Sequence, residues 1–254
     1  MRTNSILVIP DPHSKPGTSN RRAEWVGSLI RDIKPTVVVC LGDAADMESL
    51  CSYDKGTRAF QGRSYQADIE AHADFQDRLW STVKAGKKKL PRRVILEGNH
   101  ERRIERAINT QPELEGTISF EDLALHTWYD DVVRYEGSTP GTVDIHGITF
   151  AHYLVSGISG RPLSGEHHAH SILSKHHSSC VVGHSHLLDY CVRTTVSGRR
   201  IQALCAGVFQ EHTSSFAGES QKLWWKGVCL LDNVEEGSFD LRTISLEQLK
   251  KRYG

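Results

Sequence analysis

Residues 36–43 read TVVVCLGD, a β-branched apolar run that ends in a glycine and an aspartate. A short run of this composition predicts a strand that is buried on both faces. Four other runs follow the same plan and end in Asp, Asn or His: SILVIPDPH (5–13), RRVILEGNHE (92–101), GITFAHY (147–153) and SCVVGHSH (179–186). The chain therefore repeats one unit, a buried strand followed by side chains that can bind a metal.

Segments of helical periodicity separate these strands. RRAEWVGSLIRDI (21–33) places its apolar residues on one helical face, and residues 65–86 do the same. Shorter helices are predicted within 101–108, 116–126 and 161–179, and strand pairs are predicted over 189–207 and 226–244. Strands that alternate with helices indicate an α/β fold, in which ligands bind beyond the carboxyl ends of the strands. All five polar clusters are thus predicted to lie at one edge of the sheet.

The composition sets broad limits on the class of protein. The chain has 254 residues, 38% of them hydrophobic, and a formal net charge of zero, which predicts a single domain over 1–254 with a cap insertion around 47–90. No run of 18 apolar residues is present, and MRTNSILVIPDPH lacks the apolar core of a signal peptide, so we expect a cytoplasmic protein that does not bind membranes. The six cysteines form no CxxC pair and are expected to be reduced.

The residues at the strand ends combine oxygen donors with imidazoles. The candidate metal ligands are Asp11, His13, Asp43, Asn99, His152, His184 and His186. This mixture suits Mn²⁺ best, with Fe, Zn, Ni, Co or Mg as alternatives, and does not suit a calcium cage. Asp-x-His and His-x-His spacings aim both side chains of a pair to one side of a strand. The ligands outnumber the needs of one tetrahedral ion, so two divalent ions that share a carboxylate are predicted.

The motifs DPH, GDAAD, GNHE, FAH and GHSH resemble the five motifs of the calcineurin-like metallophosphoesterase superfamily. The similarity runs from Asp11 to His186, about two thirds of the chain. It implies a four-layer α/β/β/α sandwich with a dinuclear metal site at the carboxyl edge of the strands. It also implies hydrolysis of phosphate esters by a metal-activated hydroxide.

The resemblance assigns a role to each motif residue. Asp11, His13 and His186 would hold one ion, Asn99, His152 and His184 the other, and Asp43 would bridge them. His100 would face the substrate as the catalytic residue that stabilises or protonates the leaving oxygen. Asp46 would orient His100, although a helix N-cap is an alternative reading of that residue. Gly183 in VVGHSH is expected to let the chain turn sharply, so that both histidines reach inward.

Other histidines are expected to lie outside the metal site. His146 competes with His152 for the lone-histidine motif, but His152 ends the apolar run and is preferred. His72 and His126 are predicted to lie on the surface, and His212 is a weak candidate for the wall of the cleft. The histidines between 167 and 177 are expected on a polar helix face near the cleft.

The substrate is predicted less directly than the metal site. Phosphodiesters of nucleic acids or nucleotides are favoured, a phosphomonoesterase acting on nucleotides or phosphoproteins is the alternative, and a non-catalytic scaffold is remote because no ligand is lost. The chain also resembles phage-encoded phosphoesterases grouped with DNA-repair exonucleases, which implies nucleic acid as a partner and a phage-infected cell as a location. GDAAD is not followed by the Arg-Gly of protein phosphatases.

Basic residues support the nucleic-acid hypothesis. Between Lys84 and Arg106 there are nine basic and three acidic side chains, Lys87 and Lys88 among the basic ones. Candidate substrate-binding residues are Arg102, Arg103 and Arg161. Residues 47–65 mix aromatic and basic side chains, a combination that stacks bases and binds phosphates. Trp224 and Trp225 are expected to pack internally or at an oligomer contact.

Overall fold

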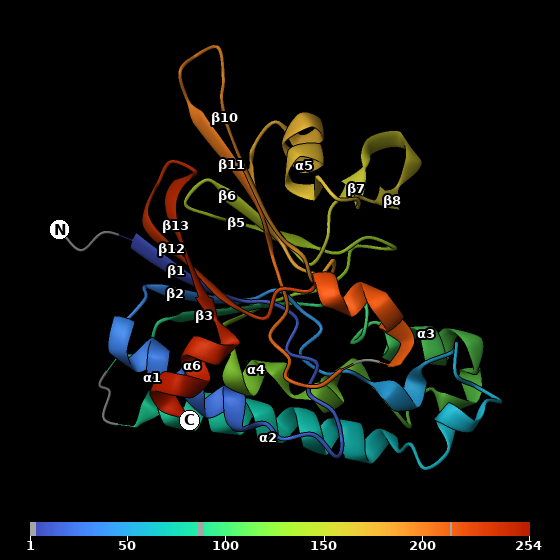
Figure 1. Ribbon diagram of the computed structural model, residues 1–254. Helices are drawn as coiled ribbons and strands as arrows, with labels where there is room; N and C mark the ends of the chain where they lie inside the picture. The colour runs from blue at the N-terminus through green and yellow to red at the C-terminus, as the bar shows by residue number, and fades with distance from the viewer. Residues whose placement is uncertain (1–3, 86–88, 214) are drawn as a thin grey trace.

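The computed structural model describes residues 4–85, 89–213 and 215–254. Two sheets form the centre of the molecule (Figure 1). The first has the strand order β13-β12-β1-β2-β3-β4, and β1 to β4 run parallel in it. Its strands are β1 (Asn4–Ile9), β2 (Val37–Cys40), β3 (Arg92–Leu96), β4 (Asp131–Val133), β12 (Gly227–Glu235) and β13 (Ser238–Ser245).

The second sheet has the order β10-β11-β9-β6-β5, with β6, β9 and β11 parallel. Its strands are β5 (Thr142–Ile145), β6 (Ile148–Ala151), β9 (Ser179–Val182), β10 (Leu188–Thr194) and β11 (Arg200–Ala206). A small ribbon of β7 (Val155–Ser156) and β8 (Arg161–Pro162) follows β6. The helices are α1 (Arg21–Ile33), α2 (Tyr65–Lys84), α3 (Arg103–Thr110), α4 (Leu125–Trp128), α5 (His168–His176) and α6 (Leu246–Tyr253).

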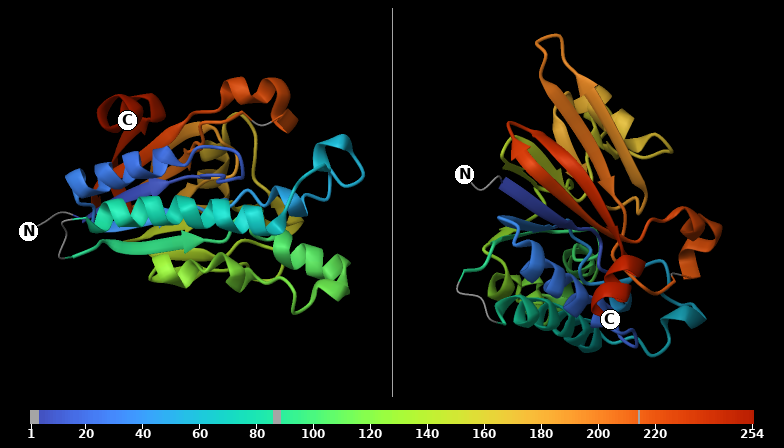
Figure 2. Two further views of the ribbon diagram at one scale, coloured as in Figure 1. Left: turned by 90° about the horizontal axis from the view of Figure 1, so that it is seen from below. Right: turned by 60° about the vertical axis from the view of Figure 1, so that its left-hand side comes forward.

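Three apolar cores hold four layers together. Alternate residues of β1 serve different cores: Leu7 and Ile9 pack under the helices, and Ile6 and Val8 pack between the sheets. A third core lies between the second sheet and α5. Figures 1 and 2 show α1, α2 and α6 on one outer face and α5 on the other. The predicted α/β/β/α sandwich is confirmed, and double-sided burial explains why the strands read as continuous apolar runs.

The predicted elements differ from the structure at several points. Residues 116–126 form a 3₁₀ turn over Phe120–Leu123, capped by Ser119 and Asp122, and only then the short α4. Strands β4 and β5 and the C-terminal helix α6 were missed. The 20 residues of α2 fall within the predicted cap around 47–90, and they pack along α1 in the helix layer, so residues 47–64 remain as a candidate cap (Figure 2).

The structure also bears on the basic stretch and on the expectation that the chain does not bind membranes. Lys87 and Lys88 of the basic stretch lie outside the described residues. Within the part of the chain that the structure describes, no helix combines the length and the apolar character needed to cross a membrane.

Candidate metal centre

The loops that follow β1, β2, β3, β6 and β9 are bound to one another by short hydrogen bonds. The amide of His13 donates to the carbonyl of Asp43 at 2.8 Å, and the amide of His184 donates to Asp11 Oδ2 at 2.7 Å. The amide of His100 donates to Asp43 Oδ1 at 2.9 Å. The carboxylates thus cross-link loops from both sheets and bring the five motifs to one place.

Five of the seven predicted ligands have a left-handed backbone. The φ angles are 42° for Asp11, 44° for His13, 48° for Asp43, 64° for His184 and 61° for His186. Non-glycine residues adopt this region rarely and at an energetic cost, and such strain concentrates at functional sites. The loops are therefore folded to aim these side chains, and the hydrogen bonds between them hold the strained conformations.

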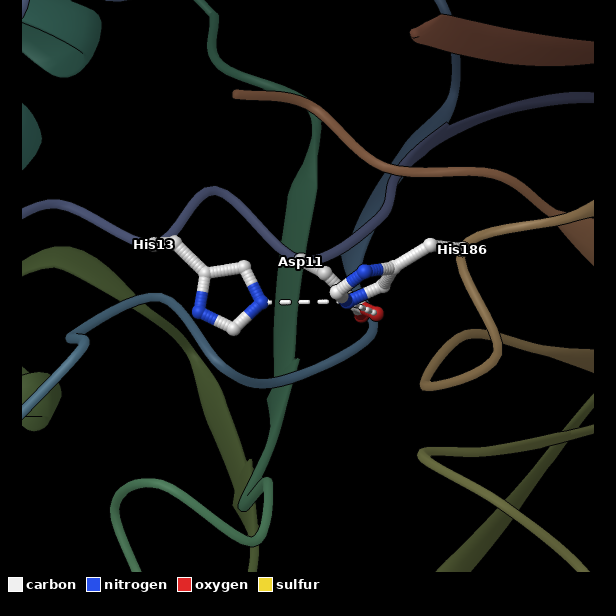
Figure 3. A group of neighbouring side chains, drawn as sticks. All are labelled: Asp11, His13 and His186. Carbon is white, nitrogen blue, oxygen red and sulfur yellow. Dashed lines mark hydrogen bonds and ion pairs between the residues drawn. The ribbon is translucent and has the colours of Figure 1, made fainter. Parts of the chain in front are cut away.

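Asp11, His13 and His186 form the first group of donors (Figure 3). Nε2 of His13 lies 3.2 Å from Nε2 of His186, and Nε2 of His186 lies 3.3 Å from Asp11 Oδ2. Asp11 Oδ1 is buried and has no hydrogen-bond partner in the structure. Buried polar atoms of this kind call for a partner, and a cation between the three side chains would supply it.

Asp43, His152 and His184 form the second group. Nε2 of His152 lies 3.4 Å from Asp43 Oδ2 and 2.9 Å from Asn99 Oδ1. Nδ1 of His152 lies 2.9 Å from the carbonyl of Leu41, which identifies Nδ1 as the protonated nitrogen and leaves Nε2 free to bind a metal.

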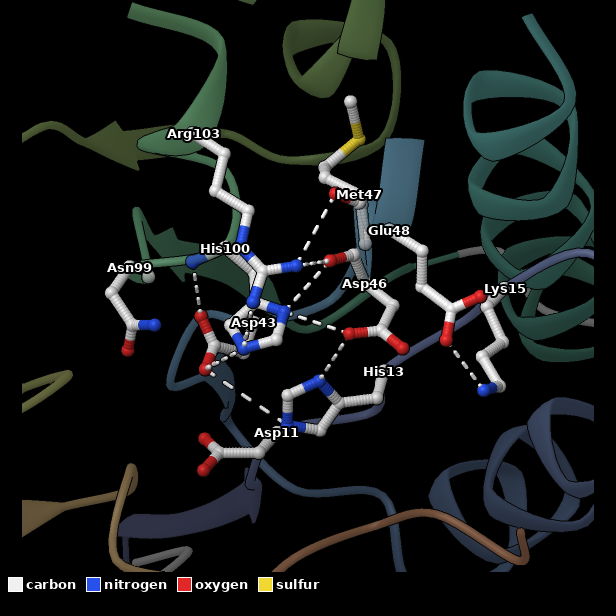
Figure 4. A network of polar contacts seen from close by, with 12 residues as sticks. Asp11, His13, Lys15, Asp43, Asp46, Met47, Glu48, Asn99, His100 and Arg103 are labelled. Atoms are coloured by element: carbon white, nitrogen blue, oxygen red, sulfur yellow. Dashed lines mark hydrogen bonds and ion pairs between the residues drawn. The ribbon is translucent and has the colours of Figure 1, made fainter. Parts of the chain in front are cut away.

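Asp43 occupies the position between the two groups. Its Oδ2 lies 3.4 Å from Nε2 of His152. The same atom lies 3.9 Å from Nε2 of both His13 and His100 (Figure 4). His13, Asp43 and His100 also form a third possible group of donors. A carboxylate oxygen that faces both donor groups has the placement that a bridging ligand requires.

Glu101 supports Asp43 from behind. Its carboxylate accepts hydrogen bonds from the amides of Asp43, Ala45 and Gly98 at 2.9, 2.9 and 2.8 Å. Burial and the nearby Asp43 charge raise the pKa of Glu101 to about 7. A Cβ at Gly98 would lie 2.2 Å from both the amide nitrogen and Oδ1 of Asp43, so only glycine fits there.

Burial and the nearby carboxylates shift the pKa values of the pocket imidazoles in opposite directions. Burial lowers the pKa of His13, and it lowers the pKa of His184 to about 4. Burial also opposes a charge on His152, but Asp43 outweighs it and raises the pKa to about 9. Burial works against the carboxylate of Asp43 as well, yet His152 and His100 hold its pKa well below the usual range.

These residues fit two divalent cations. The donors are carboxylate oxygens and imidazole nitrogens, the ligands that manganese, iron and zinc accept. Their atoms converge within 4.8 Å in each group, and facing Nε2 lone pairs of His13 and His186 leave a place for a positive charge. The donor set therefore agrees with a dinuclear site bridged by Asp43.

His100 stands beside the donor groups and is held by Asp46. Nδ1 of His100 lies 2.7 Å from both the carboxylate Oδ1 and the carbonyl oxygen of Asp46 (Figure 4). Burial disfavours a charged ring, but Asp43 and Asp46 prevail and raise the pKa of His100. Nη2 of Arg103 lies 3.2 Å from Nε2 of His100. The structure thus brings together the predicted pair of His100 and Asp46.

A model of the calcineurin-like phosphoesterase family matches residues 5–227. The chain belongs to this family. The match spans all five motifs and includes strands of both sheets, so this phosphoesterase is a member of a hydrolase family whose chemistry depends on divalent metals. Comparison with curated protein sequences gave no significant match.

Solved structures that resemble this phosphoesterase share little sequence with it. An archaeal phosphodiesterase is 10% identical, with 94% of this chain and 99% of that chain covered and a TM-score of 0.42. Yfce, a phosphoesterase from E. coli, is 14% identical, with coverage of 95% and 99% and a TM-score of 0.40. A dimetal phosphatase from Danio rerio is 12% identical, with 97% of each chain covered and a TM-score of 0.43.

The predicted substrate-binding arginines occupy different surroundings. Arg103 contacts His100 directly. Arg102 is paired with Glu105, hydrogen-bonded to the carbonyl of Gly137 at 3.0 Å and stacked 5.3 Å from the ring centre of Tyr135. Arg161 is exposed on the β7–β8 ribbon.

The structure corrects the prediction for His72 and gives a steric reason for Gly183. His72 is not on the surface: it is fully buried on α2, in an edge-to-face contact with Trp128 at 5.9 Å. Gly183 has no left-handed φ; a Cβ there would lie 2.4 Å from Asp11 Oδ1. The glycine is thus needed for space beside the carboxylate.

The remaining histidines lie outside the three groups of possible metal donors. His146 lies in the β5–β6 turn, at the opposite end of β6 from His152. In α5, His168 is buried and His170 contacts Arg193. His212 is half-buried, and the nearby charges of Lys15 and Arg22 add to burial in lowering its pKa to about 3.

Several residues near the site were not predicted from the sequence. Trp224 packs edge-to-face on the metal-ligand candidate His186 at 4.3 Å. Tyr153 lies against both His152 and His184, at 5.7 and 4.9 Å. The buried guanidinium of Arg22 donates to the carbonyl of Pro12 at 2.6 Å and so supports the DPH loop. Only Arg22 was foreseeable, because it precedes Trp25 by three residues on the buried face of α1.

Proposed function

We propose that this chain is a dinuclear phosphodiesterase that hydrolyses nucleic-acid or nucleotide diesters, with Mn²⁺ as its preferred metal. The observation that carries the proposal is the pair of donor groups on either side of Asp43 Oδ2, next to His100. Two bound divalent ions would supply a positive charge for the phosphate oxygens and would acidify a water molecule. Side chains of the protein would exchange the proton with the leaving oxygen and donate hydrogen bonds beside it.

His100 and Arg103 face the group that leaves. Asp46 holds Nδ1 of His100, so Nε2 is the atom at which a proton is exchanged with the leaving oxygen. Arg103 adds N–H donors beside it, as its contact with Nε2 shows. The half-buried Tyr153 and Trp224 pack against the ligand histidines and shield them from water.

The preference for diesters rests on the surroundings of the centre. Next to His100 lie Arg103 and a cavity lined with further cations, which suits a substrate that continues beyond the scissile phosphate. A monoesterase needs donors that neutralise the extra charge of a terminal phosphate at the centre itself.

The test compares three substrates with protein loaded with Mn²⁺: bis-p-nitrophenyl phosphate, p-nitrophenyl phosphate and single-stranded DNA. The proposal expects cleavage of the diester and of DNA, with two ions bound per chain. Cleavage of the monoester alone would replace the proposal with a phosphomonoesterase. Absence of all three activities with two ions bound would favour a binding scaffold.

A further inference from the structure

A cavity lies beside the candidate centre, between α3 and the segment that follows β2. One wall carries Leu50, Tyr53 and Lys55, and the other carries Arg103, Arg106 and Thr110. Its lining includes three cationic side chains and no carboxylate. Such a cavity attracts an anion.

The cations of this cavity are available to a ligand. Among the residues that the structure describes, Arg103 forms no ion pair: it donates to the carbonyls of Asp46 and Met47 at 2.8 and 3.2 Å and contacts the ring of His100. Lys55 and Arg106 are exposed. The neighbouring carboxylate of Asp54 is ion-paired with Arg63 at 2.8 Å and not with a cation of the cavity.

Arg103 is the wall shared by the cavity and the candidate centre. Its guanidinium lies 3.2 Å from His100 on one side and lines the cavity on the other. An anion in the cavity is therefore one side chain away from a phosphate at His100. This is the arrangement of consecutive phosphates along a polynucleotide, whereas a substrate with one phosphate leaves the cavity empty.

An aromatic ring accompanies the cations. Tyr53 lines the same cavity and is 84% exposed, the most exposed aromatic ring among the large hydrophobic side chains of the described residues. Exposed aromatic rings beside phosphate-binding cations stack bases without regard to sequence. The combination favours a single strand, because the bases of a duplex are already stacked and their faces are not accessible.

We propose that the cavity formed by Lys55, Arg103, Arg106 and Tyr53 binds the phosphate next to the scissile one, and its base, in a single-stranded nucleic acid. This rests on the proposed phosphodiesterase function and narrows its substrate class. Lys55 and Arg106 contact the neighbouring phosphate, and Tyr53 stacks on the base. They set affinity for the strand without touching the reacting atoms.

The experiment measures binding and hydrolysis separately in the Mn²⁺-loaded protein. The binding probe is a fluorescent, phosphorothioate-linked oligothymidylate of about ten nucleotides, which keeps the charges of the strand but resists cleavage. Lys55→Ala, Arg106→Ala and Tyr53→Ala are each expected to weaken binding about fivefold. For the two charge variants, the slope of log K against log salt should fall by about 0.7 for each cation removed. The control is Lys251→Ala, an exposed lysine of α6 that does not line the cavity, which should bind as the wild type does.

Hydrolysis of bis-p-nitrophenyl phosphate separates the outcomes, because this small diester does not extend into the cavity. Each cavity variant should cleave it within about twofold of the wild type while losing affinity for the strand. Unchanged affinity and salt slope in Lys55→Ala and Arg106→Ala would overturn the cavity proposal. A loss of small-diester hydrolysis equal to the loss of affinity would also overturn it.

The two proposals fail in different ways. If the wild type binds the strand through these residues but cleaves no diester, the phosphodiesterase function is wrong and the binding site stands. If the wild type cleaves diesters but these residues do not contribute to binding of the strand, the cavity proposal is wrong and the phosphodiesterase function stands. Should Arg106→Ala fold poorly, Lys55→Ala and Tyr53→Ala on the exposed segment still decide the question.

Discussion

Asp43 and His100 lie next to each other but are expected to have different roles. The Oδ2 atom of Asp43 faces both donor groups, whereas His100 is held through Nδ1 by Asp46 and borders the groups from outside. If Asp43 bridges two ions, its loss should release metal. Loss of His100 should leave the ions bound and slow the reaction of the substrate. The same network therefore predicts opposite phenotypes for the two side chains.

His100→Ala should retain two ions per chain and lose roughly 10²- to 10⁴-fold in kcat, the range typical of a lost general acid or base. Asp43→Ala should lose metal. Metal analysis after dialysis, together with diester kinetics, checks both variants. Full metal content in Asp43→Ala would contradict the bridging role, and near-normal kcat in His100→Ala would contradict the catalytic one.

At the scale of elements, the turn after β9 depends on a close approach. Because a Cβ at Gly183 would lie 2.4 Å from Asp11 Oδ1, Gly183→Ala should displace that carboxylate. We expect loss of metal and a destabilisation of about 1 to 3 kcal/mol from overpacking. Metal content and thermal unfolding measure both effects. Gly157→Ala is the matched control, since nothing lies within 4 Å of the Cβ built there; equal behaviour of the two variants would refute the steric account.

Helix α2 contains a source of pH-dependent stability away from the metal site. Burial lowers the pKa of His72 from 6.5 to about 4. Between these values the unfolded chain binds a proton that the folded chain does not, so the free energy of unfolding falls as the pH drops from about 6.5 to about 4. The contribution amounts to about 3 kcal/mol and is constant above that window.

His72→Leu should therefore lose less stability than the wild type between neutral and acidic pH. Urea unfolding of both proteins at several pH values measures the difference. His126→Leu, which replaces an exposed histidine of α4, is the control and should follow the wild type. Identical pH dependence in His72→Leu and the wild type would show that this imidazole titrates freely.

For the whole molecule, the candidate metal centre lies where the two sheets meet. Its possible donors follow β1, β2 and β3 of one sheet and β6 and β9 of the other. Ions that bind only the folded chain stabilise it by about 2.7 kcal/mol each at a hundredfold excess over Kd. A chelator should lower the Tm of the wild type by about 10 to 20 °C. Calorimetry with and without chelator measures this, and Asp43→Ala should not respond; a wild-type Tm that ignores the chelator would be inconsistent with the account.

How far the sequence predicts this molecule depends on how local each feature is. Ligands that follow a strand directly, such as Asp11 and His152, are found from the strand itself. The two-sheet arrangement is not, because Ile6 and Leu7 are equally apolar although one faces a sheet and the other a helix. Only the resemblance to a family supplied that distinction.

Contacts between distant segments were beyond the sequence patterns. Trp224 lies 38 positions from His186, and nothing in its surroundings indicates that it packs on that ring. The buried position of His72, in contrast, was available: it precedes Phe75 by three and Leu79 by seven, on the buried face of α2. Polarity alone was the wrong guide to its place.

Anomalous diffraction from crystals of the Mn²⁺-loaded protein would show directly how many ions the candidate centre binds and where. We expect two peaks per chain, one among Asp11, His13 and His186 and one among Asn99, His152 and His184, with the carboxylate of Asp43 between them. The three-residue group of His13, Asp43 and His100 offers a competing position. A single peak in that group, or two peaks that Asp43 does not join, would contradict the dinuclear assignment.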